Sequence, residues 1–164
     1  MNYFIEGREE IKSIISYNNT LEGELEFKKS IKINGTFRGT IKGEGLLFID
    51  KDGNVNADIV ANEIIIAGKF NGSIIAKSKV EIDETAEVRG SIDTYKLKVA
   101  DGATLEATCN MYSQEDLIKK IKEKYNMEFS GRTNNSQIQE NKKEIISNNM
   151  KEDNNKPKNR KNKN

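Results

Sequence analysis

The fold of this chain is decided by one stretch, Ile31-Lys32-Ile33-Asn34-Gly35-Thr36-Phe37-Arg38-Gly39-Thr40-Ile41. Apolar and polar residues alternate on both sides of a short Asn-Gly spacer, and a glycine stands between the last two apolar positions. Alternation with a period of two is typical of a β-strand with one buried and one solvated face. Asn and Gly supply the turn geometry that a corner between two such strands requires.

The same pattern recurs six times between about residues 15 and 109, at spacings of 16 or 17 residues. A fixed register over six repeats predicts the stacked rungs of a β-solenoid rather than a sandwich, because each rung must set its side chains on the rung before. The aligned repeats form four apolar columns and one column of small residues. These columns are Ile15, Ile31, Leu47, Ile64, Val80 and Leu97; Tyr17, Ile33, Ile49, Ile66, Ile82 and Val99; Leu21, Phe37, Val55, Phe70, Val88 and Leu105; Gly23, Gly39, Ala57, Gly72, Gly90 and Ala107; and Leu25, Ile41, Ile59, Ile74, Ile92 and Cys109.

Composition argues against catalysis. The 164 residues carry a net charge of +1 and include one cysteine and no histidine. Without histidine there is no Ser-His-Asp arrangement, and the usual general base and most zinc sites are lost. Cys109 falls in an apolar column and is expected to be a small buried core residue. We therefore expect a protein that is not an enzyme and needs no cofactor or metal.

Charge and hydropathy limit the partners and the compartment. A net charge near zero gives no indication of specific nucleic-acid binding. The sequence shows no signal peptide and no apolar run long enough to cross a membrane. We expect a cytoplasmic protein.

The columns resemble those of the bactofilins, bacterial polymer-forming cytoskeletal proteins. The resemblance covers about residues 15–111, and two small positions, Ala57 and Ala107, depart from it in lacking glycine. It implies an all-β, single-domain, right-handed and three-sided parallel β-helix. It also implies nucleotide-independent, head-to-tail polymerisation into filaments that support cell shape or localise cell-envelope machinery. The strings that carry it are residues 31–41, residues 64–74, Val88-Arg89-Gly90-Ser91-Ile92 and Gly102-Ala103-Thr104-Leu105-Glu106-Ala107.

The two ends of such a solenoid would be open and apolar. An uncovered rung is a template for another molecule, and an end-to-end contact that does not close produces a filament. A capped, non-polymerising β-helical adaptor that binds a partner protein is the alternative. We predict that the polymer contact is made by Ile15, Tyr17, Leu21 and Leu25 of the first rung and by Leu97, Val99, Leu105 and Cys109 of the last rung.

The segments outside the repeats are interpreted separately. Residues 1–14 form an N-terminal tail that either covers the first rung or places Tyr3, Phe4 and Ile5 on the cytoplasmic face of the inner membrane. Residues 112–129 predict an amphipathic helix that either packs on the solenoid or engages a partner. Residues 130–164 are rich in Lys and Asn and predict a disordered tail. The expected partners are copies of the chain itself, and beyond them the membrane surface and cell-wall or morphogenesis proteins.

Overall fold

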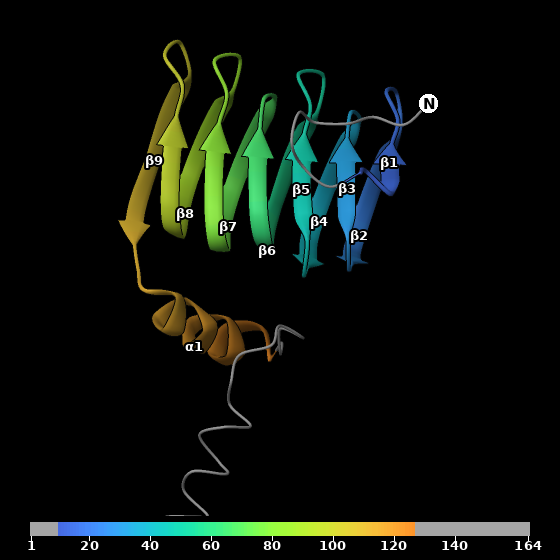
Figure 1. Ribbon diagram of the computed structural model, residues 1–164. Coiled ribbons are helices and arrows are strands. Elements are labelled where there is room, and N and C mark those ends of the chain that lie inside the picture. Colours follow the sequence, from blue (N-terminus) through green and yellow to red (C-terminus); the bar gives the residue numbers. More distant parts are fainter. Residues whose placement is uncertain (1–9, 127–164) are drawn as a thin grey trace, which may run out of the picture. The chain divides into compact units, whose positions relative to one another are not determined.

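Nine strands wind into a parallel solenoid of about six rungs, each rung being one turn of the chain (Figure 1). This description covers residues 10–126 of the computed structural model; the sequence predictions for residues 1–9 and 127–164 fall outside it. The elements are β1 (Ser13–Ile15), β2 (Thr20–Phe27), β3 (Ser30–Ile33), β4 (Thr36–Gly43), β5 (Leu46–Ile49), β6 (Asn54–Ile66), β7 (Lys69–Ile82), β8 (Glu87–Val99), β9 (Thr104–Met111) and α1 (Gln114–Tyr125).

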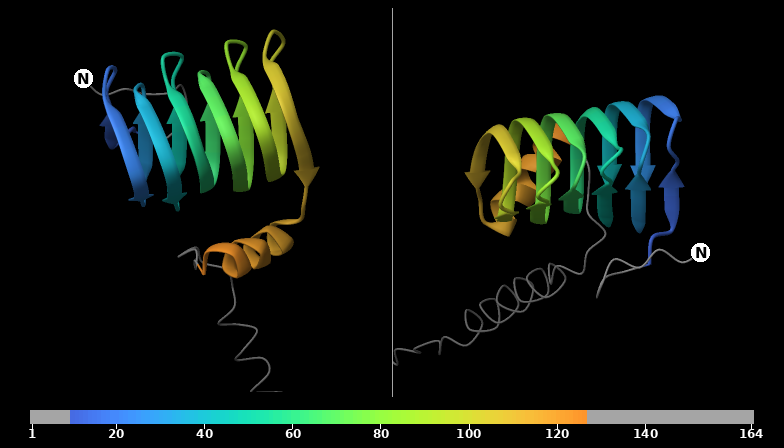
Figure 2. Two further views of the ribbon diagram at one scale, coloured as in Figure 1. Left: turned by 180° about the vertical axis from the view of Figure 1, so that it is seen from behind. Right: turned by 90° about the horizontal axis from the view of Figure 1, so that it is seen from above.

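Each strand pairs in parallel with the strand one rung away. One layer runs β1-β3-β5 and continues into the second halves of β6, β7 and β8. A second layer runs β2-β4, continues into the first halves of β6, β7 and β8, and ends at β9. Figure 2 shows the stacked rungs from behind and from above. The β-solenoid predicted from the repeats is therefore confirmed.

The core is a continuous apolar column inside the rungs. Burying each of these side chains stabilises the fold by about 1.5–3 kcal/mol. Side chains at the inward positions of the middle rungs are almost completely removed from solvent. The largest of them are Ile33, Ile41, Leu47, Ile49, Ile59, Ile64, Ile66, Ile74, Ile82 and Ile92.

The first rung is offset by two residues from the alignment made on the sequence. Ile15 lies beside Ile33, and Ser13 takes the position beside Ile31. Tyr17 lies in the turn that follows β1, and it is 64% exposed. Asn18 in this turn adopts a positive φ of 64°, a conformation that asparagine tolerates. The placement of Tyr17 in an inward column was therefore wrong.

A column of small residues lets consecutive rungs approach closely. Gly39 has a φ of +134°, and a Cβ built there would lie 1.9 Å from the Gly23 carbonyl oxygen of the rung before. Only glycine fits both this backbone conformation and this space. Ala57 and Ala107 share the column but do not have a positive φ.

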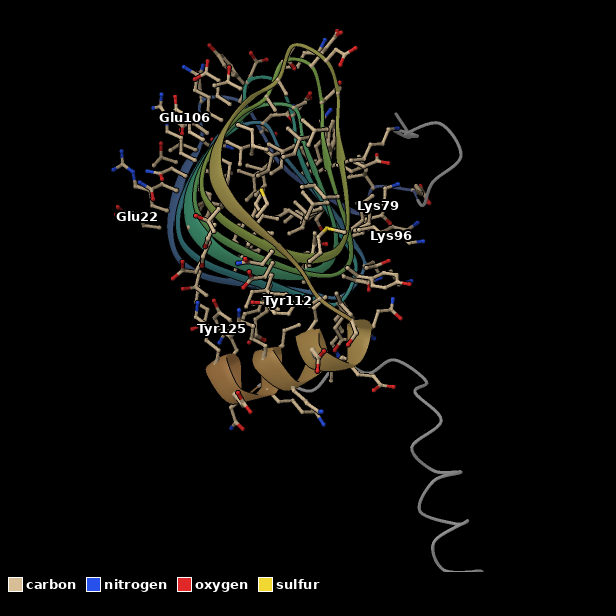
Figure 3. All side chains as sticks on the ribbon, turned by 90° about the vertical axis from the view of Figure 1, so that its left-hand side faces the viewer. Glu22, Lys79, Lys96, Glu106, Tyr112 and Tyr125 are labelled. Atoms are coloured by element: carbon tan, nitrogen blue, oxygen red, sulfur yellow. The ribbon has the colours of Figure 1, made fainter. Side chains whose placement is uncertain are left out.

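Helix α1 packs along the outside of the solenoid. Its N-cap is Ser113, whose hydroxyl accepts a hydrogen bond from the Asp116 N–H at 3.2 Å. Leu117 and Ile121 are buried in one cluster with the outward-pointing side chains Val60 of β6 and Ile75 of β7, and Tyr112 and Tyr125 pack against this cluster. Figure 3, seen along the stack, places α1, Tyr112 and Tyr125 on one side of the rungs.

Candidate self-association ends

Burial falls away at both ends of two inward columns, the one from Leu21 to Leu105 and the one from Leu25 to Cys109. Ile41, Ile59, Ile74 and Ile92 are buried in the middle rungs, whereas Leu25 at one end is only half-buried. At the other end, Cys109 is exposed. All residues of this column are apolar or weakly polar, so the end residues are less buried because no further rung covers them.

The N-terminal end is formed by β1 and β2. Ile15 is buried, but Leu21 is 45% exposed although its column neighbour Phe37 is buried. Among the described residues, β1 pairs only with β3 and β2 only with β4, so each strand has one edge without a partner strand. Unpaired strand edges invite pairing with another chain.

Three glutamates project outward from β2 at this end. Glu24 accepts a hydrogen bond from the Lys42 ammonium at 2.6 Å, and this bond raises the pKa of Lys42. Glu22 lies 3.9 Å from the Arg38 guanidinium, and Glu26 lies beside Lys42 in the ladder. This acidic row was not predicted, although its period of two, Glu22-x-Glu24-x-Glu26, is visible in the sequence.

The C-terminal end is formed by β9 and the end of β8. Val99 is 42% exposed, and Leu97 and Leu105 are half-buried. Strand β9 pairs only with β8 within the described part of the chain. The described packing contacts of α1 are with the side of the solenoid, so α1 leaves Val99 and Cys109 uncovered.

The expectation that Cys109 is a buried core residue was wrong. Cys109 lies beside Ile92, at the inward phase, but no rung follows it and its side chain is exposed. Partial burial still raises the pKa of its thiol, which therefore stays protonated near neutral pH. Its surroundings are those of an interrupted core rather than of an activated nucleophile.

The eight residues predicted to make the contact thus fall into two groups at opposite ends of the stack. Seven of them lie on inward positions of an end rung, and Tyr17 lies in a turn. Tyr3, Phe4 and Ile5, predicted for membrane contact, lie outside the described residues.

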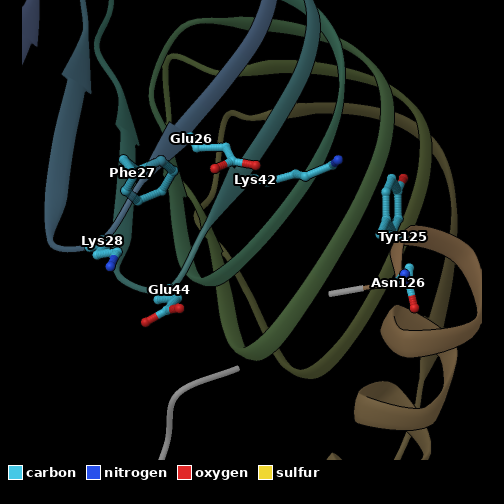
Figure 4. A pocket seen from close by; sticks show the side chains of 7 residues that line it. All are labelled: Glu26, Phe27, Lys28, Lys42, Glu44, Tyr125 and Asn126. Carbon is cyan, nitrogen blue, oxygen red and sulfur yellow. The ribbon is translucent and has the colours of Figure 1, made fainter. Parts of the chain in front are cut away.

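A separate hollow of about 510 Å³ lies where α1 ends above the first two rungs (Figure 4). Its residues offer carboxylates and amines but no nucleophile with a neighbouring base. Nor do residues 10–126 contain three or more His, Cys, Asp or Glu side chains placed to hold a metal ion. In the same range no helix has the length and apolar character to span a membrane. The lining residues are Glu26, Phe27, Lys28, Lys42, Glu44, Tyr125 and Asn126.

Comparison with known proteins gives concordant matches. The bactofilin family model, described as polymer-forming cytoskeletal, matches residues 13–110. Bactofilin BacO of Myxococcus xanthus (strain DK1622) is 34% identical over 80 residues, which are 46% of this chain and 64% of that protein. The chain thus spans less than two thirds of that relative. A cryo-EM reconstruction of Thermus thermophilus bactofilin double helical filaments shares the fold, with a TM-score of 0.56 and 21% identity over 62% of this chain and 100% of that chain.

Proposed function

Because this chain belongs to the bactofilin family of polymer-forming cytoskeletal proteins, we propose that it assembles end to end through its first and last rungs into filaments. Assembly needs no nucleotide, and the role is structural rather than catalytic. The observation that carries the proposal is the loss of burial at both ends of the Leu21–Leu105 and Leu25–Cys109 columns, whose middle positions are all buried.

Two kinds of interaction would form when an end rung meets another copy. Leu21, Val99 and Leu105 would be removed from water, each contributing up to about 1.5–3 kcal/mol. The free edges of β2 and β9 would gain backbone hydrogen bonds. Because neither contribution depends on exposed charges, we expect the filaments to persist at high salt.

Charge and strand direction together decide which end of one copy meets which end of the next. Head-to-tail contact, which the family resemblance implied, would continue the parallel ladder from β9 of one copy into β2 of the next. In that register Glu106 would lie beside Glu22 of the next copy, because both belong to one outward column. Contact between two N-terminal ends would place the glutamate row of one copy beside that of the other, and like charges in this position repel. Contact between two C-terminal ends would avoid this repulsion and also the Glu106–Glu22 pair.

Electron microscopy of the purified chain tests the proposal. We expect filaments at micromolar concentration in both low and high salt. Leu105→Arg should abolish them, because an unpaired charge in a dry contact costs several kcal/mol. Asn71→Arg is the matched control, since it adds the same charge to an exposed outward position of β7 in a middle rung. Monodisperse particles of the unaltered chain would favour the capped adaptor, and filaments of Leu105→Arg would show that the contact lies elsewhere.

Thiol cross-linking separates the possible orders of the ends. In the unaltered chain, oxidation can join two copies only where two C-terminal ends bring their Cys109 residues together. Leu25 shares a column with Cys109, so Leu25→Cys would place the two thiols on adjacent strands in a head-to-tail contact. Adjacent strands lie about 4.8 Å apart, within the range of a disulfide. A disulfide-linked ladder of Leu25→Cys without a linked dimer of the unaltered chain indicates head-to-tail order, and a linked dimer of the unaltered chain indicates contact between C-terminal ends.

In the cell, such filaments would lie in the cytoplasm and support cell shape or localise cell-wall and morphogenesis proteins. Contact with the cytoplasmic face of the membrane through Tyr3, Phe4 and Ile5 would place them at the envelope. Liposome flotation with and without residues 1–10 tests this contact. Equal flotation of the two forms would remove the N-terminal segment as the anchor.

A further inference from the structure

Three apolar side chains point away from the core on one outer face of the solenoid. They are Leu46 and Phe48 of β5 and Ile65 of β6, which alternate with inward residues of the same strands. Leu46 is only 6% exposed and Ile65 only 7%. Ile14, in the same outward column as Phe48 and Ile65, is 44% exposed. We call Leu46, Phe48 and Ile65 the outer patch; the low exposure of Leu46 and Ile65 is that of a covered surface.

Helix α1 does not account for this burial. Its buried residues pack with Val60 and Ile75, which belong to other outward positions. Lys79 and Lys96 continue the outward column of Leu46 along the stack. Figure 3 shows these two lysines on a different side of the rungs from α1. The outer patch and α1 therefore occupy separate faces.

The chain enters this face from its N-terminal side. The Lys12 N–H donates to the Ser30 carbonyl at 3.3 Å and to its hydroxyl at 3.2 Å. The Ser30 hydroxyl in turn donates to the Glu10 carbonyl at 2.5 Å. Ser30 points outward, is buried, and lies beside Leu46 in the ladder. The backbone at Glu10 thus lies over the outer side of β3, at the border of the outer patch.

We propose that residues 1–9 of the same chain fold back along this face and cover the outer patch with Tyr3, Phe4 and Ile5. Ile65 lies two rungs beyond Ser30, a distance of about 10 Å at the usual strand spacing. The five residues between Phe4 and Glu10 can span about 17 Å when extended. The reach is therefore sufficient, and the apolar character of the segment matches the surface.

This arrangement is independent of filament formation, but it bears on membrane contact. The three residues that would touch a membrane are the same three that would cover the outer patch. Each copy can use them in one place at a time, so membrane contact would require their release from Leu46, Phe48 and Ile65.

Hydrogen–deuterium exchange of the full chain tests the proposal. In the unaltered protein, backbone amides of residues 3–8 should exchange at least roughly tenfold more slowly than in an unstructured peptide. Ile65→Lys should return them to nearly unstructured rates. Ile14→Lys is the matched control, since it makes the same change in the same outward column outside the patch, and it should leave the protection intact.

A second variant works from the other side of the contact. Replacing Tyr3, Phe4 and Ile5 by serine leaves the solenoid sequence unchanged and should remove the protection as Ile65→Lys does. Unprotected amides in the unaltered chain would overturn the proposal. So would loss of protection in Ile14→Lys but not in Ile65→Lys, because that result would assign the protection to the end contact of a filament.

Discussion

Gly39 shows how one residue can set the distance between rungs. Its φ is +134°, which disfavours residues with a side chain. A Cβ at this position would also lie 1.9 Å from the Gly23 carbonyl oxygen, which is too close. We expect Gly39→Ala to lower the free energy of unfolding by more than about 4 kcal/mol. Gly23→Ala is the control: its φ is +129° but nothing lies within 4 Å, so only the backbone cost of about 1–3 kcal/mol applies. Urea denaturation measures both, and equal losses would contradict the steric argument.

Asp50 at a corner gives the fold a dependence on acid. Burial alone would raise the pKa of its carboxyl, but the Lys32 ammonium at 2.7 Å and the Lys51 N–H at 2.8 Å outweigh burial and lower it. Because the pKa is lower in the folded protein, the ionised Asp50 carboxylate stabilises the fold at pH values above its unfolded pKa, near 3.8. This stabilisation is lost as the pH falls through the lower pKa of the folded protein.

We expect Asp50→Asn to cost roughly 1–2 kcal/mol at pH 7, because it leaves Lys32 without this carboxylate. The difference from the unaltered chain should shrink as the pH falls below 3.8 and through the lowered pKa of the Asp50 carboxyl. Urea midpoints at neutral pH and below pH 3.8 test this, with the exposed neighbour Asp52→Asn as control. A difference that stays constant with pH would rule out the carboxylate as its cause.

At the level of residues, the sequence predicted the inward columns of the middle rungs but not their ends. The predicted alignment of the first rung was shifted by two residues, because apolar Tyr17 was assigned to an inward column and polar Ser13 was not. The Asn18-Asn19 pair after Tyr17 was the signal of a five-residue corner between Ile15 and Leu21. Cys109 was misplaced because a column pattern does not show whether another rung follows.

Among the elements, α1 differs from the strands in contacting several rungs of the solenoid at once. Each rung of a solenoid contacts mainly its neighbours. Helix α1 follows β9, yet its residues are buried with Val60 of β6 and Ile75 of β7. The Lys120 ammonium also lies 2.5 Å from the Asp93 carboxylate of β8, and this contact raises the pKa of Lys120. The helix therefore holds three consecutive rungs together from outside.

Leu117→Asp should detach α1, because it buries a charge against Val60 and Ile75. We expect a loss of about 3 kcal/mol in the free energy of unfolding and faster proteolysis after Met111. Lys119→Asp, on the exposed side of the same helix, serves as the control and should change stability by less than about 0.5 kcal/mol. Similar losses in the two variants would mean that helix propensity, not docking, is being measured.

Several outward positions of the strands are apolar, which the period-two pattern did not predict. The alternation with a period of two led us to expect solvated outward positions throughout. Continuous apolar runs such as Leu46-Leu47-Phe48-Ile49 and Ile64-Ile65-Ile66 break the alternation, and runs of this kind indicate strands covered on both faces. They mark the outer patch, and the pairs Ile59-Val60 and Ile74-Ile75 mark the contact with α1.

For the whole molecule, the stacked rungs fix the length that each copy adds to a filament. About six rungs at about 4.8 Å give an axial rise of about 29 Å per copy if the end rungs stack as the inner rungs do. Diffraction or image analysis of filaments should show this rise together with a 4.8 Å strand spacing. A rise several ångströms longer would mean that the ends do not stack directly.

The uncovered thiol of Cys109 provides a way to count the free C-terminal ends of a polymer. A cysteine on the last rung is accessible in a free copy and is enclosed wherever that rung meets another. The fraction of thiol that reacts with a polar maleimide should therefore fall as assembly proceeds and approach the number of free C-terminal ends divided by the number of copies. A single chemical titration would then report the mean filament length, and severing the filaments should restore reactivity in proportion to the breaks made.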